Sequence, residues 1–172
     1  MLTLKPCNMQ DARKEYEFVR AIPEDENGFT NAWNGVSYEE FCEKALPQML
    51  DWAQGKNLPD GFVPETFLFL WHSEEIVGQF RVRHHLCDSL RTGGGHIGYF
   101  IGKAHRGKGY ASEGLRLTLE YARNVVPEEE FYLRLYKNNA ASLRVMLKNG
   151  GRIVGEDGEH LFVRIHNPGK TE

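Results

Sequence analysis

The sequence predicts a single domain of the α+β class that spans residues 1–172. The length fits one domain, because domains typically hold about 100–200 residues. With 41% hydrophobic and 26% charged residues, the composition is that of a globular protein that can bury its own core. Segments with helical apolar spacing and segments with β-like composition follow one another without a repeat or a linker, which favours one α+β domain.

Residues 1–53 are expected to hold one strand and two helices. Residues 2–4 alternate weakly and predict a short strand, and a helix is expected from about Asn8 to Ala21. Residues 23–35 have no clear period and are interpreted as a loop or a short helix, long enough to have a binding role. Residues 37–40, Ser-Tyr-Glu-Glu, form a capping box that predicts a second helix to about Ala53.

Residues 66–101 are expected to form three strands. Residues 66–71 and 76–83 are rich in apolar and β-branched side chains, and the turn between them is so short that they should pair antiparallel. Residues 96–101 predict the third strand, in which Gly98 indicates a bulge or a close backbone approach.

The remaining residues are expected to add two helices and three strands. A helix from about Gly109 to Asn124 places Leu115, Leu119 and Ala122 on one apolar face. The other expected elements are a strand at residues 131–136, a helix at 139–148 that ends at Asn149-Gly150-Gly151, and a final hairpin of residues 152–155 and 160–165.

Charge and hydropathy exclude several classes of function. The chain has 24 acidic and 21 basic residues and no basic stripe, which argues against a nucleic-acid partner. No apolar stretch approaches the roughly 20 residues of a membrane span, and no signal peptide is recognised, so a cytoplasmic protein without a membrane partner is expected. Cys7, Cys42 and Cys87 are widely spaced and are interpreted as buried or incidental thiols; no metal site is expected.

The unit with the clearest chemistry is the strand, glycine loop and helix of residues 96–124. Gly107 and Gly109 bring unobstructed backbone N–H groups to the first turn of a helix, where the helix dipole favours an anion. Arg106 and Lys108 add positive charge and Ser112 adds a hydroxyl, so a pyrophosphate fits this loop. The loop matches neither the G-x-x-x-x-G-K-[ST] pattern nor the G-x-G-x-x-G pattern.

The loop residues 106–111, Arg-Gly-Lys-Gly-Tyr-Ala, resemble the R/Q-x-x-G-x-G/A pyrophosphate loop of the GCN5-related N-acetyltransferase (GNAT) superfamily. Downstream, Asn139 and Ser142 match the N-x-x-[AS] motif of that superfamily, although Asn139 is equally an ordinary helix N-cap. The order of elements resembles the superfamily over essentially the whole chain. The resemblance implies a bacterial-type member with the GNAT fold, in which helices flank both faces of a mixed, largely antiparallel central sheet.

The resemblance also implies acetyl-CoA as the co-substrate, with no metal. The strands at residues 99–101 and 131–136 are expected to splay apart and pair with the pantetheine, with Gly98 setting the bulge that opens the cleft. A backbone N–H near Phe100 or Ile101 would polarise the thioester during direct transfer to an amine. The implied cofactor-binding residues are Phe100, Ile101, Arg106, Gly107, Lys108, Gly109, Tyr110, Ala111, Ser112, Asn139 and Ser142.

The catalytic acid and base are less clearly indicated. Many members of the superfamily carry an acidic tyrosine seven residues after the motif asparagine, where this chain has Met146, which cannot donate a proton. Tyr136 is the candidate acid, with a core or rim tyrosine as the alternative. His96 is the candidate base, with a strand-end histidine bonded to a turn as the alternative. At most one of His84 and His85 should face the cleft, because neighbouring strand residues point to opposite faces.

The resulting hypothesis is an acetyl-CoA-dependent N-acetyltransferase that acts on a primary amine, with a small molecule as the expected partner. Protein N-terminal acetylation, as of ribosomal proteins, and a non-catalytic acyl-CoA-binding module remain alternatives. The resemblance places the acidic residues 24–26 on the acceptor side, where they favour a cationic small molecule unless they form a solvated loop. Arg81 and Arg83 share a strand face. Two interpretations are open: these arginines bind an acidic group of the substrate, or they are simply exposed to solvent. Sheet edges and the final hairpin are compatible with a homodimer.

Overall fold

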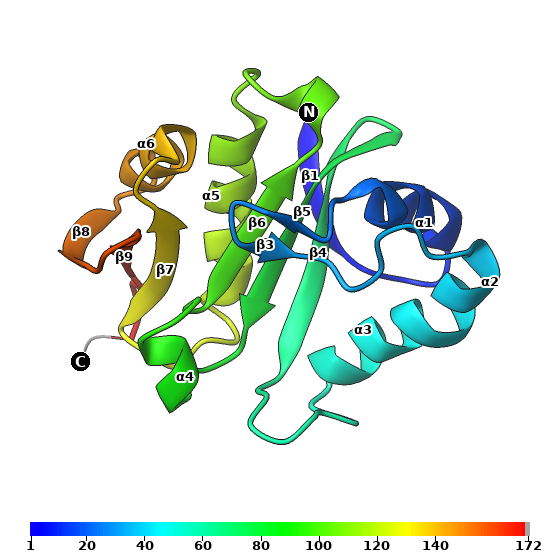
Figure 1. Cartoon of the computed structure of the whole chain (residues 1–172), viewed down its shortest axis with the longest axis horizontal. Helices are drawn as coiled ribbons and strands as arrows, with labels where there is room; N and C mark the ends of the chain where they lie inside the picture. Colours follow the sequence, from blue (N-terminus) through cyan, green and yellow to red (C-terminus); the bar gives the residue numbers. More distant parts are fainter. Residues whose placement is uncertain (171–172) are drawn as a thin grey trace.

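In the computed structural model, which describes residues 1–170, two antiparallel sheets meet side by side (Figure 1). The first sheet has the order β1-β4-β5-β6, with β1 (Leu2–Pro6), β4 (Glu65–His72), β5 (Glu75–Arg83) and β6 (Ile97–Ile101). The second sheet has the order β7-β9-β8, with β7 (Glu130–Tyr136), β8 (Arg152–Glu156) and β9 (His160–His166). The strands at residues 66–71 and 76–83 pair antiparallel as predicted, and so does the final hairpin.

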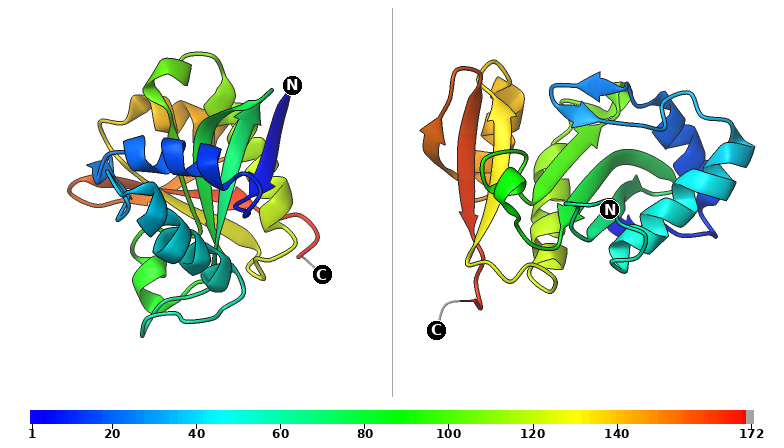
Figure 2. Two further views of the ribbon diagram at one scale, coloured as in Figure 1. Left: turned by 90° about the vertical axis from the view of Figure 1, so that its right-hand side faces the viewer. Right: turned by 60° about the horizontal axis from the view of Figure 1, so that its bottom comes forward.

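Helices cover both faces of the first sheet (Figure 2). On one face lie α1 (Ala12–Ala21) and α3 (Leu46–Ala53), which contact β5 and β4. On the other face, α5 (Tyr110–Ala122) contacts β1, β5 and β6, and α6 (Ala140–Lys148) packs against α5. The shorter elements are α2 (Tyr38–Glu40), the π-helical turn η1 (Phe41–Ala45), α4 (Asp88–Arg91) and the 3-10 turn η2 (Lys103–His105). The predicted α+β fold with helices on both faces is confirmed.

Strand β4 explains how one sheet supports two helical layers. Phe67 and Phe69 belong to the apolar cluster under α1 and α3, whereas Leu68 and Leu70 belong to the cluster under α5. Successive side chains of a strand point to opposite faces, so a strand covered on both faces must be apolar at nearly every position. All residues of β4 except the last are buried.

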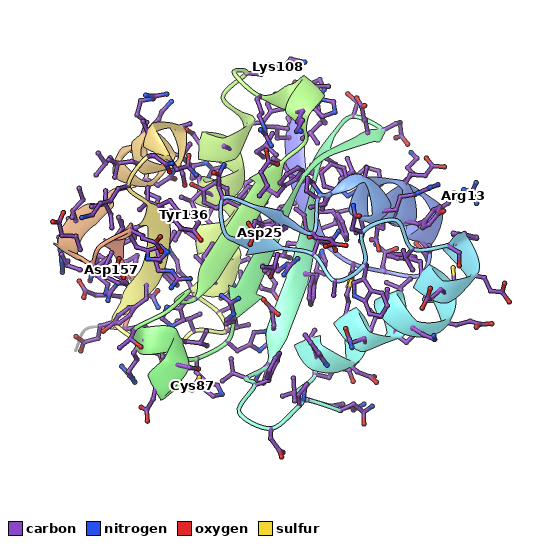
Figure 3. The ribbon with its side chains drawn as sticks, viewed as in Figure 1. Arg13, Asp25, Cys87, Lys108, Tyr136 and Asp157 are labelled. Atoms are coloured by element: carbon purple, nitrogen blue, oxygen red, sulfur yellow. The ribbon has the colours of Figure 1, made fainter. Side chains whose placement is uncertain are left out.

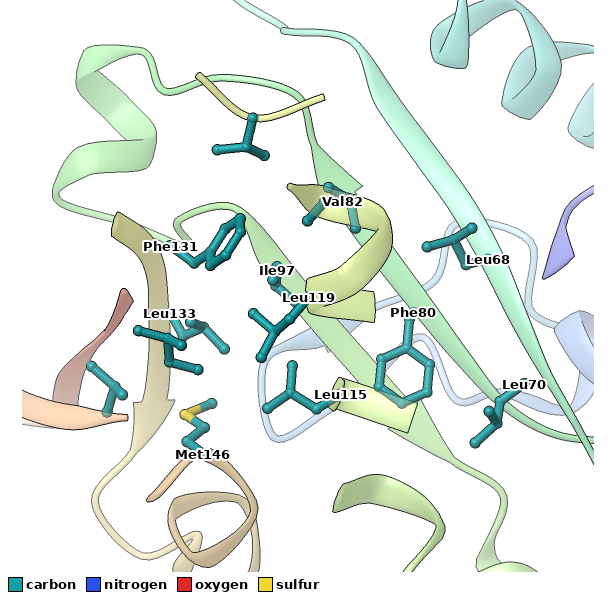
Figure 4. Packing of buried hydrophobic residues seen from close by; sticks show 14 of the residues in the cluster. Leu68, Leu70, Phe80, Val82, Ile97, Leu115, Leu119, Phe131, Leu133 and Met146 are labelled. Carbon is teal, nitrogen blue, oxygen red and sulfur yellow. The ribbon is translucent and has the colours of Figure 1, made fainter. Parts of the chain in front are cut away.

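The apolar face of α5 joins the two sheets into one core (Figure 4). Leu115 is fully buried and Leu119 is 5% exposed, and they share a cluster with Phe131 and Leu133 of β7. The prediction that these leucines occupy one buried helix face is therefore confirmed. Met146 of α6 closes the same cluster with 2% exposure.

The second predicted helix is capped by Ser37 as expected, whereas the first helix starts four residues later than predicted. The Ser37 hydroxyl accepts a hydrogen bond from the Glu40 N–H at 3.1 Å, as the capping box predicts, while the Glu40 carboxylate pairs with Lys44 instead of returning to Ser37. The first helix starts at Ala12 rather than Asn8, because the Asn8 Oδ1 accepts from the Asp11 N–H and forms a turn before the helix.

Two local predictions need correction. Residues 23–35 contain a short hairpin, β2 (Asp25–Glu26) and β3 (Phe29–Thr30), whose turn Asn27-Gly28 has positive φ at both positions. Asn-Gly is the preferred sequence of such turns, and this signal was available in the sequence. No bulge occurs at Gly98, because β6 pairs with β5 in unbroken register from Ile97 to Ile101. In this sheet the register shifts between Leu70 and Trp71 of β4.

Candidate active site

An open cleft of about 760 Å³ lies between the two sheets, below the β2–β3 hairpin. Its walls come from the hairpin, β6, the loop before α5, the end of β7 and the start of α6. The residues predicted for the site that line it are Phe100, Ile101, Arg106, Gly107, Gly109, Tyr110, Ala111, Ser112, Tyr136, Asn139 and Ser142. Lys108 and His96 are not among the lining residues.

The cleft exists because β6 and β7 are joined only at one end. The His96 N–H donates to the Tyr132 carbonyl at 2.7 Å, and a single bridge joins Gly95 to Leu133. Beyond this point the two strands belong to different sheets and diverge (Figure 1). The predicted splaying of these strands is confirmed, and it arises without a bulge at Gly98.

The register of β6 shows which backbone groups face the cleft. The Arg83 N–H donates to the His96 carbonyl and the Gly102 N–H donates to the Val77 carbonyl, so the even-numbered residues of this stretch bond to β5. In an antiparallel ladder the alternate residues then point their N–H and C=O groups the other way. Ile101 therefore presents its N–H to the cleft, whereas the Phe100 N–H faces β5.

The glycine loop ends in a helix terminus with free donors. Gly107 has φ +75° and Gly109 has φ +79°, a conformation that side chains with a Cβ rarely adopt. Gly109 is the N-cap of α5, and the first α-helical hydrogen bond after it joins the Glu113 N–H to the Gly109 carbonyl at 3.2 Å. The N–H groups of residues 110–112 have no acceptor within residues 1–170, so they are available to an anion.

The two cations of the loop are placed differently. Arg106 lines the cleft: its Nε donates to the Ile101 carbonyl at 3.0 Å, and its other two nitrogens bind both carboxylate oxygens of Glu26. Lys108 points away from the cleft, at the edge of the molecule in Figure 3, and its Nζ donates to the Ala104 carbonyl at 3.1 Å. Arg106 is therefore the loop cation that faces the cleft.

The start of α6 forms the opposite wall. The Asn139 Oδ1 accepts from the Ser142 N–H at 3.1 Å, so the predicted N-cap is confirmed. The Ser142 Oγ and the Tyr99 hydroxyl are hydrogen-bonded at 2.6 Å, which connects β6 to α6. Burial raises the pKa of Tyr99 to about 12, so this phenol stays protonated at neutral pH. Tyr99 is a cleft residue that the sequence reasoning missed, because its partner lies on a distant helix.

Tyr136 lies in the cleft at the end of β7, between the second sheet and the hairpin (Figure 3). Its ring centroid is 4.6 Å from that of His160 on β9, and its Cε2 would lie 3.1 Å from a Cβ at Gly28. The His160 Nδ1 is 3.1 Å from the Asp157 Oδ1, an arrangement that orients the imidazole and leaves its Nε2 for the cleft. Sequence reasoning missed His160, since only the register of β9 places it opposite Tyr136.

His96 is placed away from the cleft. It is fully buried, its Nδ1 accepts from the Tyr132 N–H at 2.9 Å, and its Nε2 donates to the Glu128 carboxylate at 3.1 Å. Burial lowers the pKa of His96, and the hydrogen bond to Glu128 only partly opposes this effect. Both ring nitrogens are occupied, so the geometry favours a structural role for His96 and gives no support to its predicted role as a base.

The other candidates are also remote or apolar. The His84 Nε2 bonds to the Thr66 hydroxyl at 2.7 Å, and the His85 Nδ1 lies 3.2 Å from the Leu86 carbonyl. Neither histidine lines the cleft. Met146 borders the cleft but belongs to the core, and it offers no proton.

The end of the cleft under the hairpin is rich in arginine. Arg81 and Arg83 of β5 line it, and the Arg81 Nη2 donates to the Thr30 carbonyl at 2.6 Å. Of the acidic residues 24–26, Glu26 is paired with Arg106, Asp25 accepts a hydrogen bond from the Gly28 N–H, and Glu24 is exposed. None of these three residues therefore offers a free carboxylate in the cleft, and the hypothesis that they attract a cationic amine gains no support.

The sequence profile of the acetyltransferase (GNAT) domain matches residues 2–152. The chain belongs to the GNAT family. A probable N-acetyltransferase of Bacillus subtilis, YjcK, is 30% identical over 83 residues, which cover 48% of this GNAT chain and 45% of that protein. The match thus spans less than half of the relative's length.

Solved structures confirm the GNAT fold. The ribosomal-protein-S5-alanine acetyltransferase of Vibrio fischeri aligns with a TM-score of 0.74 at 16% identity, over 99% of this chain and 96% of that one. RimJ of Mycobacterium smegmatis, in complex with CoA-disulfide, aligns with a TM-score of 0.70 at 20% identity, over 96% and 81%. The spermidine N-acetyltransferase of Vibrio cholerae, in complex with CoA and spermine, aligns with a TM-score of 0.60 at 14% identity, over 96% of this chain and 95% of that one.

Two further observations on this GNAT chain concern metal-binding groups and membrane-spanning helices. Within residues 1–170, no three or more His, Cys, Asp or Glu side chains gather in a group that could hold a metal ion. In the same part of the chain, no helix combines the length and apolar character that crossing a membrane requires.

Proposed function

We propose that this chain is an acetyl-CoA-dependent N-acetyltransferase that transfers the acetyl group directly to the primary amine of a small molecule. One observation carries the proposal: a single cleft joins the free N–H groups at the start of α5 to the unpaired edge of β6. The first feature suits the pyrophosphate of CoA, and the second suits the amides of its pantetheine arm. Family membership supports this use of the cleft.

The residues of the loop would hold the donor. The N–H groups of residues 110–112 and the Arg106 guanidinium would bind the phosphates, with Gly107 and Gly109 allowing the backbone to approach. Asn139 and Ser142 border the path of the pantetheine, and the outward edge of β6 at Tyr99 and Ile101 supplies backbone groups for its amides. Lys108 would contribute charge without direct contact, because its ammonium bonds to Ala104.

Acetyl-CoA supplies an activated acetyl thioester, and the residues of the cleft govern the transfer. The amine nitrogen forms a bond to the thioester carbon, the carbon–sulfur bond breaks, and the electron pair leaves on sulfur. The Ile101 N–H stabilises the carbonyl oxygen in the transition state. Tyr136 gives its proton to the thiolate, and His160, oriented by Asp157, takes the proton that the amine loses.

The hairpin over the acceptor end supports a small molecule rather than a protein N-terminus as the substrate. Phe29 of the hairpin packs on Phe100 with ring centroids 5.8 Å apart, and the Thr30 carbonyl accepts from Arg81. The hairpin thus lies across the acceptor end, where a folded protein would have to displace it (Figure 1).

The test measures release of free CoA thiol from acetyl-CoA with a panel of small primary amines and with peptides that carry a free N-terminus. We expect turnover with at least one small amine and less with the peptides. Preferred turnover of peptides would support the protein N-terminal alternative. Tight binding of acetyl-CoA in calorimetry without turnover of any amine would support the non-catalytic binding module and overturn the proposal.

A further inference from the structure

Two arginines lie at the end of the cleft away from the phosphate-binding loop. Arg81 pairs with Gly98 in the sheet, and the Arg83 N–H donates to the His96 carbonyl, so both sit beside the start of β6. The loop begins after the other end of this strand, at Gly102. A rise of about 3.3 Å per residue separates Gly98 from Gly102 by roughly 13 Å. These arginines are therefore poorly placed to bind the pyrophosphate of the donor.

The Arg81 guanidinium packs against two aromatic rings. Its guanidinium lies 4.3 Å from the ring centroid of Phe29 and 5.2 Å from that of Phe67, and its Nε is buried without a hydrogen-bond acceptor. Within residues 1–170 no carboxylate comes within ion-pair distance of it. Burial lowers the pKa of Arg81 to about 10, which still leaves it protonated at neutral pH.

The neighbouring charges leave this end of the cleft positive. The Arg83 Nε is 3.7 Å from the Glu65 Oε1, and its Nη1 donates to the Gly95 carbonyl at 3.1 Å. In the described part of the chain, the Glu65 carboxylate thus pairs with Arg83 alone, and Arg134 of β7 adds another cation to the lining of the cleft. Glu26, the one acidic residue within residues 1–170 that lines the cleft, is paired with Arg106.

We infer that the acceptor amine carries an oxyanion group, a carboxylate or a phosphate, which binds Arg81 and Arg83 while the amine reaches the thioester. This inference rests on the proposed acetyltransferase function and names its substrate class. A charge-assisted hydrogen bond to a guanidinium would satisfy the unused Arg81 N–H donors, and the half-enclosed site would strengthen it. A second ammonium group, as in a polyamine, would instead meet two positive charges.

The first arm of the experiment compares acceptors that differ only in the group opposite the amine. The pairs are 4-aminobutanoate with 4-aminobutanamide and 3-aminopropyl phosphate with 3-aminopropanol; 1,4-diaminobutane represents the cations, and ω-amino acids of increasing length probe the spacing. We expect the carboxylate or the phosphate member to exceed its neutral partner at least tenfold in kcat/KM. The two pairs separate a carboxylate substrate from a phosphate substrate.

The second arm tests which residues bind the oxyanion group of the substrate. Arg81→Gln should reduce the preference for the charged member to less than threefold, with CoA affinity within threefold of the wild type. Arg123→Gln, which removes the same charge from an exposed position at the end of α5, should keep the full preference. Arg83→Gln serves as the second site variant, and thermal melting establishes that each variant is folded before its kinetics are compared.

The third arm separates the substrate class from the activity. Calorimetry compares 4-acetamidobutanoate with 4-acetamidobutanamide on the CoA-saturated protein, where no turnover is needed. Tighter binding of the carboxylate, lost in Arg81→Gln, supports the inference even if no amine is acetylated. Turnover that favours neutral or dicationic amines overturns the inference and leaves the acetyltransferase proposal intact. Equal binding of the two acetamides also overturns it.

Discussion

Arg106 and Glu26 form a bidentate ion pair that joins the β2–β3 hairpin to the loop before α5. The two nitrogen–oxygen distances are 3.1 and 3.0 Å, and the third guanidinium nitrogen donates to the Ile101 carbonyl. The hydrogen bonds from Arg106 hold the pKa of Glu26 below its usual range. The same arginine therefore touches the hairpin over the acceptor end, the edge of β6 and the proposed phosphate site.

Glu26→Gln is expected to bind CoA more tightly than the wild type. The carboxylate of Glu26 competes with phosphate for Arg106, and a partly exposed ion pair contributes up to about 1 kcal/mol, which corresponds to an increase in affinity of roughly fivefold. Calorimetry with CoA measures the change, and Glu24→Gln, an exposed neighbour, provides the matched control. Weaker CoA binding by Glu26→Gln would show that the pair assists the donor site instead of competing with it.

Parts of the site whose conformation depends on residues close in the sequence could be predicted, whereas contacts between residues distant in the sequence could not. The Gly107–Gly109 loop and the Asn139 cap are set by neighbouring residues, so the sequence predicts their conformations directly. Arg106 was predicted to face the phosphates, but its partner Glu26 is 80 residues away along the chain. Such a pair depends on how the hairpin folds back over β6, which no local pattern encodes.

His96 and Arg81 show the same limit for residues on strands. Position in a strand predicts which face a side chain takes but not what covers that face. His96 was expected in the cleft, yet the bridge between β6 and β7 encloses it beside Glu128. Two alternatives were stated for Arg81, an exposed position and a binding role. The hairpin of residues 25–30, which had been interpreted as part of a loop or a short helix, covers this arginine.

Gly109→Asp is expected to abolish CoA binding, with a loss of affinity of at least 100-fold. The change forces a side chain onto a residue at φ +79° and places a carboxylate where the phosphates are proposed to bind. Gly158→Asp adds the same charge at an open turn without a positive φ and should leave affinity unchanged. Calorimetry with CoA measures both variants. Retained affinity in Gly109→Asp would remove this loop from the donor site.

His96→Gln is expected to affect stability and its pH dependence, but not the shape of the pH–rate profile. The pKa of His96 is lowered in the folded state, so the unfolded chain takes up a proton first as the pH falls below about 6.5, and stability declines there. Loss of the buried hydrogen bonds should cost about 1–3 kcal/mol at pH 7.5.

Urea unfolding at pH 7.5 and pH 5.0 checks this prediction for His96. The variant should show a smaller loss of stability between the two pH values than the wild type, because it lacks the group that is protonated on unfolding. A kcat/KM profile that flattens in His96→Gln, with stability unchanged, would restore His96 as the base and contradict the structural role.

Tyr136→Phe is expected to lower kcat about 100-fold while leaving CoA affinity unchanged, because it removes the proposed proton donor without removing the ring. Tyr99→Phe is the matched control: it also removes a cleft phenol, but one whose hydroxyl is bonded to Ser142. If Tyr136 donates the proton to the thiolate, Tyr99→Phe should reduce kcat by less than tenfold. His160→Gln should slow the Tyr136→Phe enzyme less than it slows the wild type, because the effects of substitutions at two adjacent, coupled groups are not additive. Steady-state kinetics of the wild type, the three single variants and the Tyr136→Phe/His160→Gln double variant with one amine provide the measurement. A larger loss in Tyr99→Phe than in Tyr136→Phe would transfer the role of the acid to Tyr99, beside the start of α6.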